Sequence, residues 1–265
     1  MLTTVSADGT DVRAYDEGEG PPVVIVGPGM DDGSRTKKLA SLLTRRFRVL
    51  RLQRRQYRLD LKAGGASCSI AQEAADVLSL VRTAGEPVIL YGHSSGGVVA
   101  LEALAASPDA FAGAVIFEPA AVIGPPLGGA ALGRARAAEA SGRPGKALAI
   151  FMREVVGMPA WQATPAGVLI GAAPRYRRLV PSQLDDLHAL DELGVRLDAY
   201  AQIPVPTVLL GGDRSPAHLA ERLDAIANVL PNGERVVMHK RDHSADLKDP
   251  QQIVRIIDGL ADDVL

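Results

Sequence analysis

The chain has 265 residues, which is long enough for one large domain or for a core with an inserted lobe. Lysine and arginine (29) nearly balance aspartate and glutamate (31), so the net charge of −2 lacks the basic excess of a protein that binds a phosphate backbone. Apolar residues at 47% and charged residues at 23% exclude a disordered chain, and a single cysteine, Cys68, excludes an intrachain disulfide and a cysteine-based metal cluster. We expect a globular protein with no nucleic-acid partner.

The first residues, MLTTVSADGT, have neither the basic start nor the apolar run of a secretory signal. Glycine or proline interrupts the apolar runs that begin at Val23 and Val88, well short of the roughly 20 residues that span a bilayer. We therefore expect a cytoplasmic protein with no membrane partner.

Short apolar runs alternate with amphipathic stretches, which is typical of a mostly parallel sheet covered by helices on both faces. The chain opens with two short strands, 3–6 and 12–15, around a turn signal at 7–10. Further strands are predicted at 22–26, 47–52, 87–91, 113–117, 206–210 and 234–238. Helices are predicted at 34–43, 70–83, 95–106, 217–229 and 250–260. The fold class is α/β.

No convincing strand lies between residues 121 and 203, where alanine-rich helical stretches dominate. We therefore predict a core formed by 1–120 and 204–265, with 121–203 inserted as a helical cap. Met152 and Trp161 belong to this insertion and are expected to line an apolar pocket between cap and core, although plain packing on the core is the alternative.

The strongest local motif is GHSSGG at 92–97, a GxSxG pattern between a predicted strand and a predicted helix. A serine on so tight a turn has a strained backbone and needs small neighbours two positions away, which Gly92 and Gly96 provide. The turn would present the Ser94 hydroxyl at the carboxyl end of the sheet and place the Ser95 N–H at a helix N-terminus, where it can stabilise an oxyanion. We predict that Ser94 is a nucleophile.

With this motif the chain resembles the α/β-hydrolase family over nearly its whole length. The order of motifs agrees: an opening hairpin, a glycine-rich loop after the third strand, the serine turn, Glu118-Pro119 at a strand end, a later LLGGD segment and a late histidine. The resemblance implies the α/β-hydrolase fold, with a mostly parallel eight-stranded sheet, helices on both faces and a helical cap inserted after the sixth strand.

The resemblance also implies a histidine as general base, and histidine is the side chain whose ordinary pKa lies near neutrality. Of the two histidines after the last predicted strand, His239 prolongs the strand and His243 lies in the loop that carries the base in the family. We expect His243 to be the base and His239 to be structural. The remaining histidines are expected to be structural or surface residues: His93, His188 and His218.

Two carboxylates at strand ends compete to orient that histidine. Asp213 follows the seventh strand, the commonest place in the family, but Arg214 stands where the usual spacing from Gly211 would put the acid. Glu118 ends the strand before the insertion, which is the acid position in a family subset that includes some dehalogenases and lactonases. We favour Glu118 and retain Asp213 as the alternative.

The family often has His-Gly in the loop after the third strand, but Val26 stands at the histidine's place in this chain. Because Pro28 has no N–H, the second oxyanion donor is expected from the backbone of Gly29 or Met30, beside that of Ser95.

Charged residues near this loop depart from the family pattern. Asp31 and Asp32 are expected to face solvent or to cap the following helix. Where the family often has Asp-x-Arg-Gly-x-Gly, the chain reads QRRQY at 53–57, and we expect Arg54 and Arg55 to be structural or solvated rather than an anion clamp.

These residues predict a cofactor-independent serine hydrolase that cleaves an ester or lactone through an acyl-enzyme on Ser94. The aromatic content of 4% favours a small to medium apolar substrate over a stacked carbohydrate. A serine nucleophile argues against haloalkane dehalogenases and epoxide hydrolases, which carry aspartate at that place.

A different class remains open, since the same fold hosts non-hydrolytic lyases, biosynthetic cyclases and ligand-binding proteins. Such a protein would not depend on its serine. A metal enzyme is the third candidate, and it is disfavoured because His239 and His243 lie on a strand end and a loop rather than on one helix. We expect no cofactor or metal, a small-molecule substrate, and a monomer or homodimer.

Overall fold

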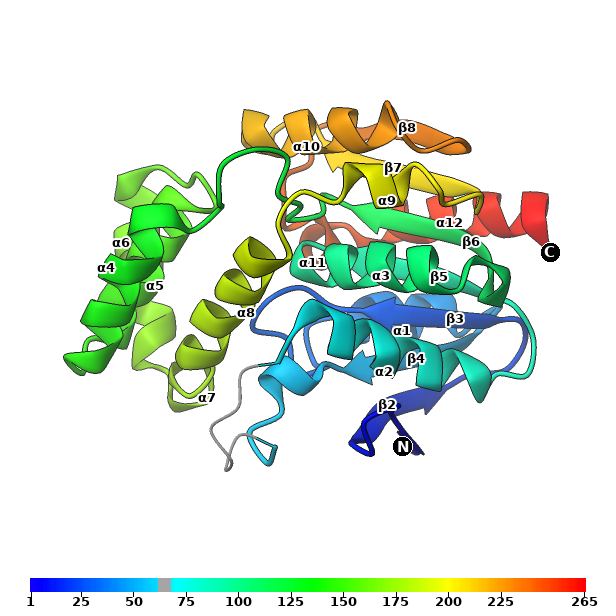
Figure 1. The fold of residues 1–265 in the computed structure, drawn as a ribbon, viewed down its shortest axis with the longest axis horizontal. Helices are drawn as coiled ribbons and strands as arrows, with labels where there is room; N and C mark the ends of the chain where they lie inside the picture. The colour runs from blue at the N-terminus through cyan, green and yellow to red at the C-terminus, as the bar shows by residue number, and fades with distance from the viewer. Residues whose placement is uncertain (62–67) are drawn as a thin grey trace.

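The computed structural model describes residues 1–61 and 68–265. Within them, eight strands form one sheet in the order β1-β2-β4-β3-β5-β6-β7-β8 (Figure 1). The strand β2 runs antiparallel to β1 and β4, and the other neighbours are parallel. The strands are β1 (Leu2–Val5), β2 (Asp11–Glu17), β3 (Pro22–Val26), β4 (Arg48–Gln53), β5 (Val88–His93), β6 (Phe111–Phe117), β7 (Thr207–Gly212) and β8 (Gly233–Met238).

Both faces of the sheet are apolar, so successive side chains of the central strands pack against helices on opposite sides. Val24 and Leu90 belong to the apolar cluster with α2 (Ile70–Arg82), α3 (Ser95–Ala106) and α10 (Ala217–Ala227). Their neighbours Val23 and Ile89 belong to the cluster with α1 (Lys37–Leu43), α11 (Ala245–Lys248) and α12 (Pro250–Val264). Each central strand is therefore buried on both faces, which explains its continuous apolar run.

Helices fill the chain between β6 and β7. They are α4 (Gly129–Ala140), α5 (Pro144–Glu154), α6 (Ala160–Ala172), α7 (Pro174–Arg177), α8 (Val180–Leu193) and α9 (Leu197–Tyr200). Helices α4 to α7 stand away from the sheet on one side of the molecule, and α8 leads back toward it (Figure 1). Helices α5 and α6 cross closely, because a Cβ at Gly171 would lie 2.5 Å from the Cα of Gly145. Below, these inserted helices are called the cap.

The predicted α/β-hydrolase fold is confirmed, and every predicted strand is present with its ends shifted by two residues or fewer. Helix α1 begins three residues later than predicted, at Lys37. The reason is Asp31, whose Oδ1 accepts from the N–H groups of Gly33 (2.8 Å) and Arg35 (2.9 Å) and holds these residues in turns. Two short 3₁₀ helices, η1 (Arg55–Tyr57) and η3 (Pro108–Ala110), were not predicted.

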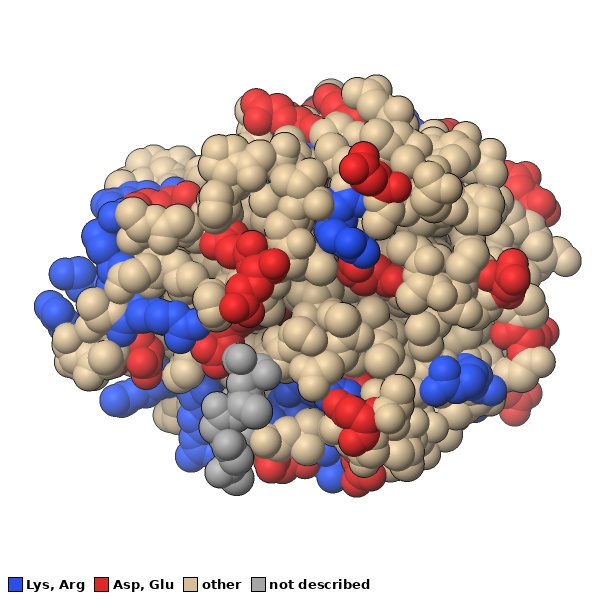
Figure 2. All heavy atoms as spheres, viewed as in Figure 1, with Lys and Arg blue, Asp and Glu red and all other residues tan. Residues whose placement is uncertain are grey.

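Charged side chains are mixed over the face drawn in Figure 2. Basic residues gather over the cap, but acidic ones lie among them and broad uncharged areas separate the groups. The mixture of both signs on this face is consistent with the net charge of −2.

Candidate active site

Ser94 lies on a sharp turn between β5 and α3, with φ of 55° and ψ of −125°. Glycine neighbours permit this strained conformation, since a Cβ at Gly92 would lie 2.7 Å from the Cβ of Ala100 and one at Gly96 would collide with the carbonyl of Gly27. The turn is anchored to the neighbouring strand: the N–H of Ser94 donates to the carbonyl of Phe117 at 3.0 Å. The turn therefore places Ser94 directly after β5, at the edge where the parallel strands end.

His243 and Glu118 form a hydrogen-bonded pair beside this turn. The Nδ1 of His243 lies 2.6 Å from Oε2 of Glu118, while Oε1 accepts from the N–H of Gly212 at 2.8 Å. Burial alone would raise the pKa of Glu118, but the hydrogen bond and charge of His243, with the Gly212 amide, hold that pKa below its usual value. An ionised Glu118 keeps the proton on Nδ1 of His243 and leaves Nε2 free to accept one.

Asp213, the alternative acid, lies in a different pair. Its Oδ2 is 2.6 Å from Nδ1 of His239, and the His239 side chain is 78% exposed. The structure thus brings His243 together with Glu118 and not with Asp213. The cause is the path of the chain after β7: Gly212 turns its N–H toward Glu118, and Asp213 follows at the rim beside the end of β8.

A buried layer supports the His243 ring from behind. The His93 ring stacks on Phe117 at 4.4 Å and lies 4.7 Å from the ring of His243. Burial lowers the pKa of His93 to about 4, so this ring is neutral near pH 7. Asp246, 3.5 Å from Nδ1 of His93, receives two hydrogen bonds from Arg35, at 2.7 and 2.9 Å. Sequence reasoning missed the Arg35–Asp246 pair, because the two residues are 211 positions apart.

Ser94, His243 and the predicted oxyanion residues open onto one cavity of about 1200 Å³ between core and cap. The cavity lining also includes Ser95, Gly29 and Met30. A Cβ at Gly29 would lie 2.2 Å from Oε1 of Gln183 on α8, so this loop meets the cap closely and a side chain there would force Gln183 to move.

The two predicted pocket residues of the cap lie in different places. Met152 lines the cavity. Trp161 does not contribute to its lining and is 75% exposed, which corrects that prediction. Gln162, Ala166 and Ile170 of α6 do line the cavity, at the four-residue spacing of one helix face, and Trp161 precedes that face by one position.

Arg54 has the predicted structural role, and it has more hydrogen-bond partners than the sequence suggested. The Arg54 side chain is fully buried and donates to Glu73 of α2 (Nε–Oε1, 3.1 Å), to Asp186 of α8 (Nη2–Oδ1, 2.7 Å) and to Oγ of Ser95 (2.7 Å). Tyr57 donates to the same Asp186 at 2.7 Å. The guanidinium of Arg54 therefore joins the cap (Asp186), the core (Glu73) and the serine turn (Ser95).

Arg55 pairs with Asp8 and Asp76, in agreement with a structural arginine. The prediction for Asp31 needs correction, because this side chain is buried at the start of α1 rather than facing solvent. Burial raises the pKa of Asp31 against the opposing effect of the Arg35 N–H. Asp32 accepts from the N–H of Ser34 at 3.2 Å in a turn that precedes α1, and the N-cap of α1 is Thr36 with no side-chain cap, so the predicted cap at Asp32 or Ser34 is wrong.

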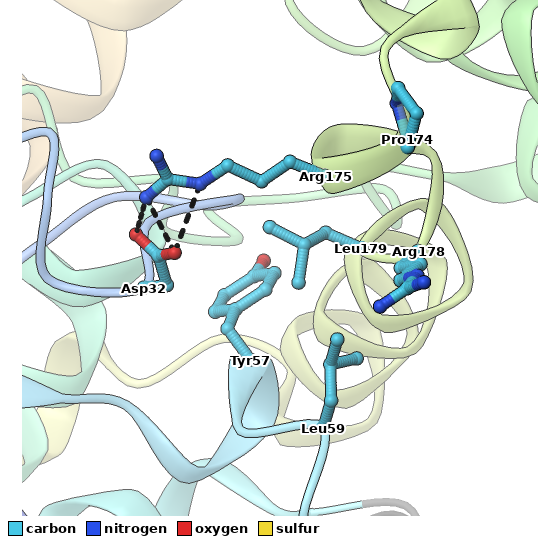
Figure 3. Close-up of a pocket in the computed structure, with 7 residues that line it drawn as sticks. All are labelled: Asp32, Tyr57, Leu59, Pro174, Arg175, Arg178 and Leu179. Carbon is cyan, nitrogen blue, oxygen red and sulfur yellow. Dashed lines mark hydrogen bonds and ion pairs between the residues drawn. The ribbon is translucent and has the colours of Figure 1, made fainter.

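A smaller cavity of about 350 Å³ is lined by Asp32, by Tyr57 and Leu59 after β4, and by residues of α7 and of the turn between α7 and α8. Figure 3 shows Arg175 of α7 reaching Asp32 across its opening, with Tyr57 and Leu179 facing one another below. Ser94 and His243 do not line this cavity, so the large cavity is the candidate active site.

In residues 1–61 and 68–265, no group of three or more histidine, cysteine, aspartate or glutamate side chains is arranged to hold a metal ion. Across the same residues, every helix falls short of the length and apolar character needed to cross a bilayer.

Comparison with known proteins places these features in a family. The model described as the alpha/beta hydrolase family matches residues 8–256. An alpha/beta hydrolase from Sphaerobacter thermophilus is similar in structure, with a TM-score of 0.80, 25% identity, and coverage of 98% of this chain and 99% of that one. No curated protein matches the chain.

Two further solved structures share the fold at lower identity. The esterase RhEst1 from Rhodococcus sp. ECU1013 has a TM-score of 0.74 and 19% identity, covering all (100%) of this chain and 99% of the other. Est816, described as an N-acyl homoserine lactone degrading enzyme, has a TM-score of 0.72 and 19% identity, covering 97% of this chain and 99% of the other.

Proposed function

Because the chain belongs to the alpha/beta hydrolase family, we propose that it is a serine hydrolase that cleaves an ester or a lactone through an acyl-enzyme on Ser94. One observation carries the proposal: the strained Ser94 and His243, which is hydrogen-bonded to the buried Glu118, line the same cavity between core and cap.

In the proposed reaction, the Oγ of Ser94 attacks the substrate carbonyl while Nε2 of His243 takes its proton. Glu118 holds the His243 ring through Nδ1 and stabilises the imidazolium that forms. The N–H of Ser95, at the N-terminus of α3, and that of Gly29 or Met30 are the proposed donors to the oxyanion. His243 then protonates the leaving alcohol, and water activated by the same histidine releases the acid.

The cavity supports a substrate with an apolar body. Its wall from the cap includes Leu148, Phe151, Met152 and Ile170, which favour an acyl or alkyl group over a sugar. Neighbours of the same fold are named as an esterase and as a lactone-degrading enzyme, and esters and lactones are therefore the first substrates to test.

The direct test compares hydrolysis of p-nitrophenyl esters of two to eight carbons and of γ-lactones by the wild type and by Ser94→Ala. We expect Ser94→Ala to lose about 10³-fold or more in kcat/KM, as nucleophile removal does in serine hydrolases. Ser41→Ala, a serine of α1 on the same cavity wall, is the matched control and is expected to stay within about threefold. Equal activity of Ser94→Ala and wild type, or a wild type inert toward every ester and lactone, would overturn the proposal.

A further inference from the structure

The lining of the large cavity carries an excess of basic side chains. Its only carboxylate among the described residues is Asp242, whereas its basic residues are Arg35, Lys37, Lys38, Arg214, Arg222 and Lys248. Lys248 pairs with Asp242 at 2.5 Å, and Arg35 pairs with Asp246. In residues 1–61 and 68–265, the other four have no carboxylate within 4.0 Å. A cavity of this kind favours a ligand that brings negative charge.

Arg222 of α10 is the half-buried member of these four. Its Nε donates to the carbonyl of Ala121 at 2.9 Å, and its Nη1 contacts the carbonyl (2.6 Å) and Nδ1 (2.5 Å) of His218. All three acceptors are uncharged groups, and within the described chain Nη2 has no hydrogen-bond partner. Burial lowers the pKa of Arg222, with Glu221 opposing, as expected for a cation that lacks a close anion.

His218 fixes this guanidinium without neutralising it. Its Nε2 lies 2.9 Å from the carbonyl of Val156, so Nε2 carries the proton and Nδ1 accepts from Arg222. Burial lowers the pKa of His218, which keeps the ring neutral. Because Val156 follows α5, this contact also joins the cap to α10 beside the cavity.

Arg222 is also close to the proposed nucleophile along the backbone. Ala120 donates its N–H to the carbonyl of Ser94 at 3.1 Å, and the next residue, Ala121, accepts from Arg222 at 2.9 Å. The dipeptide Ala120-Ala121 thus connects the serine turn with the guanidinium of Arg222. The side chains of Ser94 and Arg222 both line the large cavity.

We propose that the substrate carries a carboxylate, which binds Nη2 of Arg222 while the ester or lactone carbonyl lies at Ser94. This inference rests on the proposed hydrolase function and adds a substrate class: a half-ester or lactone acid with an apolar middle. The two N–H groups of Nη2 are the donors left for the carboxylate, and a hydrogen bond between a guanidinium and a carboxylate is stronger than one between neutral groups. Lys37, Lys38 and Arg214 add positive charge around the cavity and attract the same anion.

The first experiment measures hydrolysis of monobenzyl glutarate and of benzyl hexanoate, a neutral ester of similar length, by release of benzyl alcohol. Arg222→Met keeps an apolar stem but removes the charge, and we expect it to lower kcat/KM for the glutarate ester roughly tenfold or more, chiefly through KM, since a charged hydrogen bond is worth about 1.5–3 kcal/mol. Hydrolysis of benzyl hexanoate is expected to stay within about threefold. Arg222→Lys should recover part of the preference, and Arg255→Met, at an exposed position of α12, should change neither rate.

The second experiment separates this inference from the proposed function. Monobenzyl glutarate is titrated calorimetrically into Ser94→Ala and into the double variant Ser94→Ala/Arg222→Met. Binding that the second substitution weakens tenfold supports the carboxylate site even if the wild type hydrolyses neither ester, an outcome that would count against the hydrolase alone. Unchanged ester preference and unchanged binding in the Arg222→Met background would overturn the carboxylate site and leave the hydrolase standing.

Discussion

Glu118 takes φ of 41°, a conformation that non-glycine residues rarely adopt, and it follows the last residue of β6. Its N–H donates to the carbonyl of Leu210 at 3.0 Å, and its carboxylate reaches both Gly212 and His243. The strain at Glu118 resembles that at Ser94, and both residues end adjacent strands. The strained turns at Ser94 and Glu118 therefore lie side by side at the ends of the paired strands β5 and β6, next to the proposed reaction site.

The first prediction distinguishes the two acids. Glu118→Gln should lower kcat for ester hydrolysis by about 10³-fold or more, because a neutral amide neither fixes the proton on Nδ1 of His243 nor stabilises its imidazolium. Asp213→Asn, which alters only the exposed pair with His239, should stay within about threefold. Steady-state kinetics on one ester checks both, and a larger loss in Asp213→Asn would reverse the assignment.

His93 gives a prediction for acid stability. Its pKa is about 4 in the folded protein against 6.5 in the unfolded chain, so unfolding takes up a proton between these values. The contribution of His93 to the free energy of unfolding is nearly constant well above pH 6.5 and falls as the pH drops toward 4. A shift of one pKa unit corresponds to about 1.36 kcal/mol. The shifted pKa of His93 therefore lowers the free energy of unfolding by about 2 kcal/mol between pH 7.5 and pH 5.0.

The measurement is urea denaturation of the wild type and His93→Phe at pH 7.5 and 5.0. Phenylalanine keeps the stacking on Phe117, and the polar contact that it removes is the 3.5 Å approach of Asp246 to Nδ1 of His93. The wild type should lose about 2 kcal/mol more than the variant over this interval. An equal loss in both proteins would show that His93 is not buried in its neutral form.

At the scale of elements, the cap is held to the core by buried charge as well as by apolar contact. Arg54 follows β4, Glu73 belongs to α2 and Asp186 belongs to α8, so one ion cluster joins three elements. The chain separates Arg54 from Asp186 by 132 positions. No local pattern could predict that pairing, although a carboxylate inside an apolar helix face, as at Glu73, is the signal for a buried partner.

Removing the cation from this cluster should be costly. Arg54→Met leaves Glu73 and Asp186 buried without their partner, and we expect a loss of about 3–5 kcal/mol in the free energy of unfolding. Arg46→Ala, which breaks an exposed ion pair with Asp262, should cost less than about 1 kcal/mol. Urea denaturation at pH 7.5 measures both, and similar small losses would mean that the buried cluster contributes little.

For the molecule as a whole, the fold was predictable because strand and helix periods are local properties of the sequence. The strands of the sheet and the serine turn at Ser94 were found within two residues, since apolar runs, glycines and helix starts mark them. Residues placed by long-range packing were less predictable: Trp161 faces outward, Asp31 is buried, and the pairing of His243 was left between two acids until the strand ends were positioned.

The same distinction holds for the chemistry. The motif identifies the nucleophile, whereas Arg222, His218 and the basic lining of the cavity come from core segments that lie far apart in the sequence and that only the folded chain brings together. His218 was expected to be a surface residue, and the structure places it on the cavity wall. Substrate preference is therefore a property of the whole molecule and not of any one segment.

The central claim is that Ser94 is an activated nucleophile, and it is tested most directly by intact-mass measurement after treatment with a fluorophosphonate. The folded wild type should gain the mass of a single adduct, and Ser94→Ala and heat-denatured wild type should gain none, because the reaction needs a serine whose proton His243 can remove. A folded wild type that gains no adduct, or an adduct that persists in Ser94→Ala, would contradict the account.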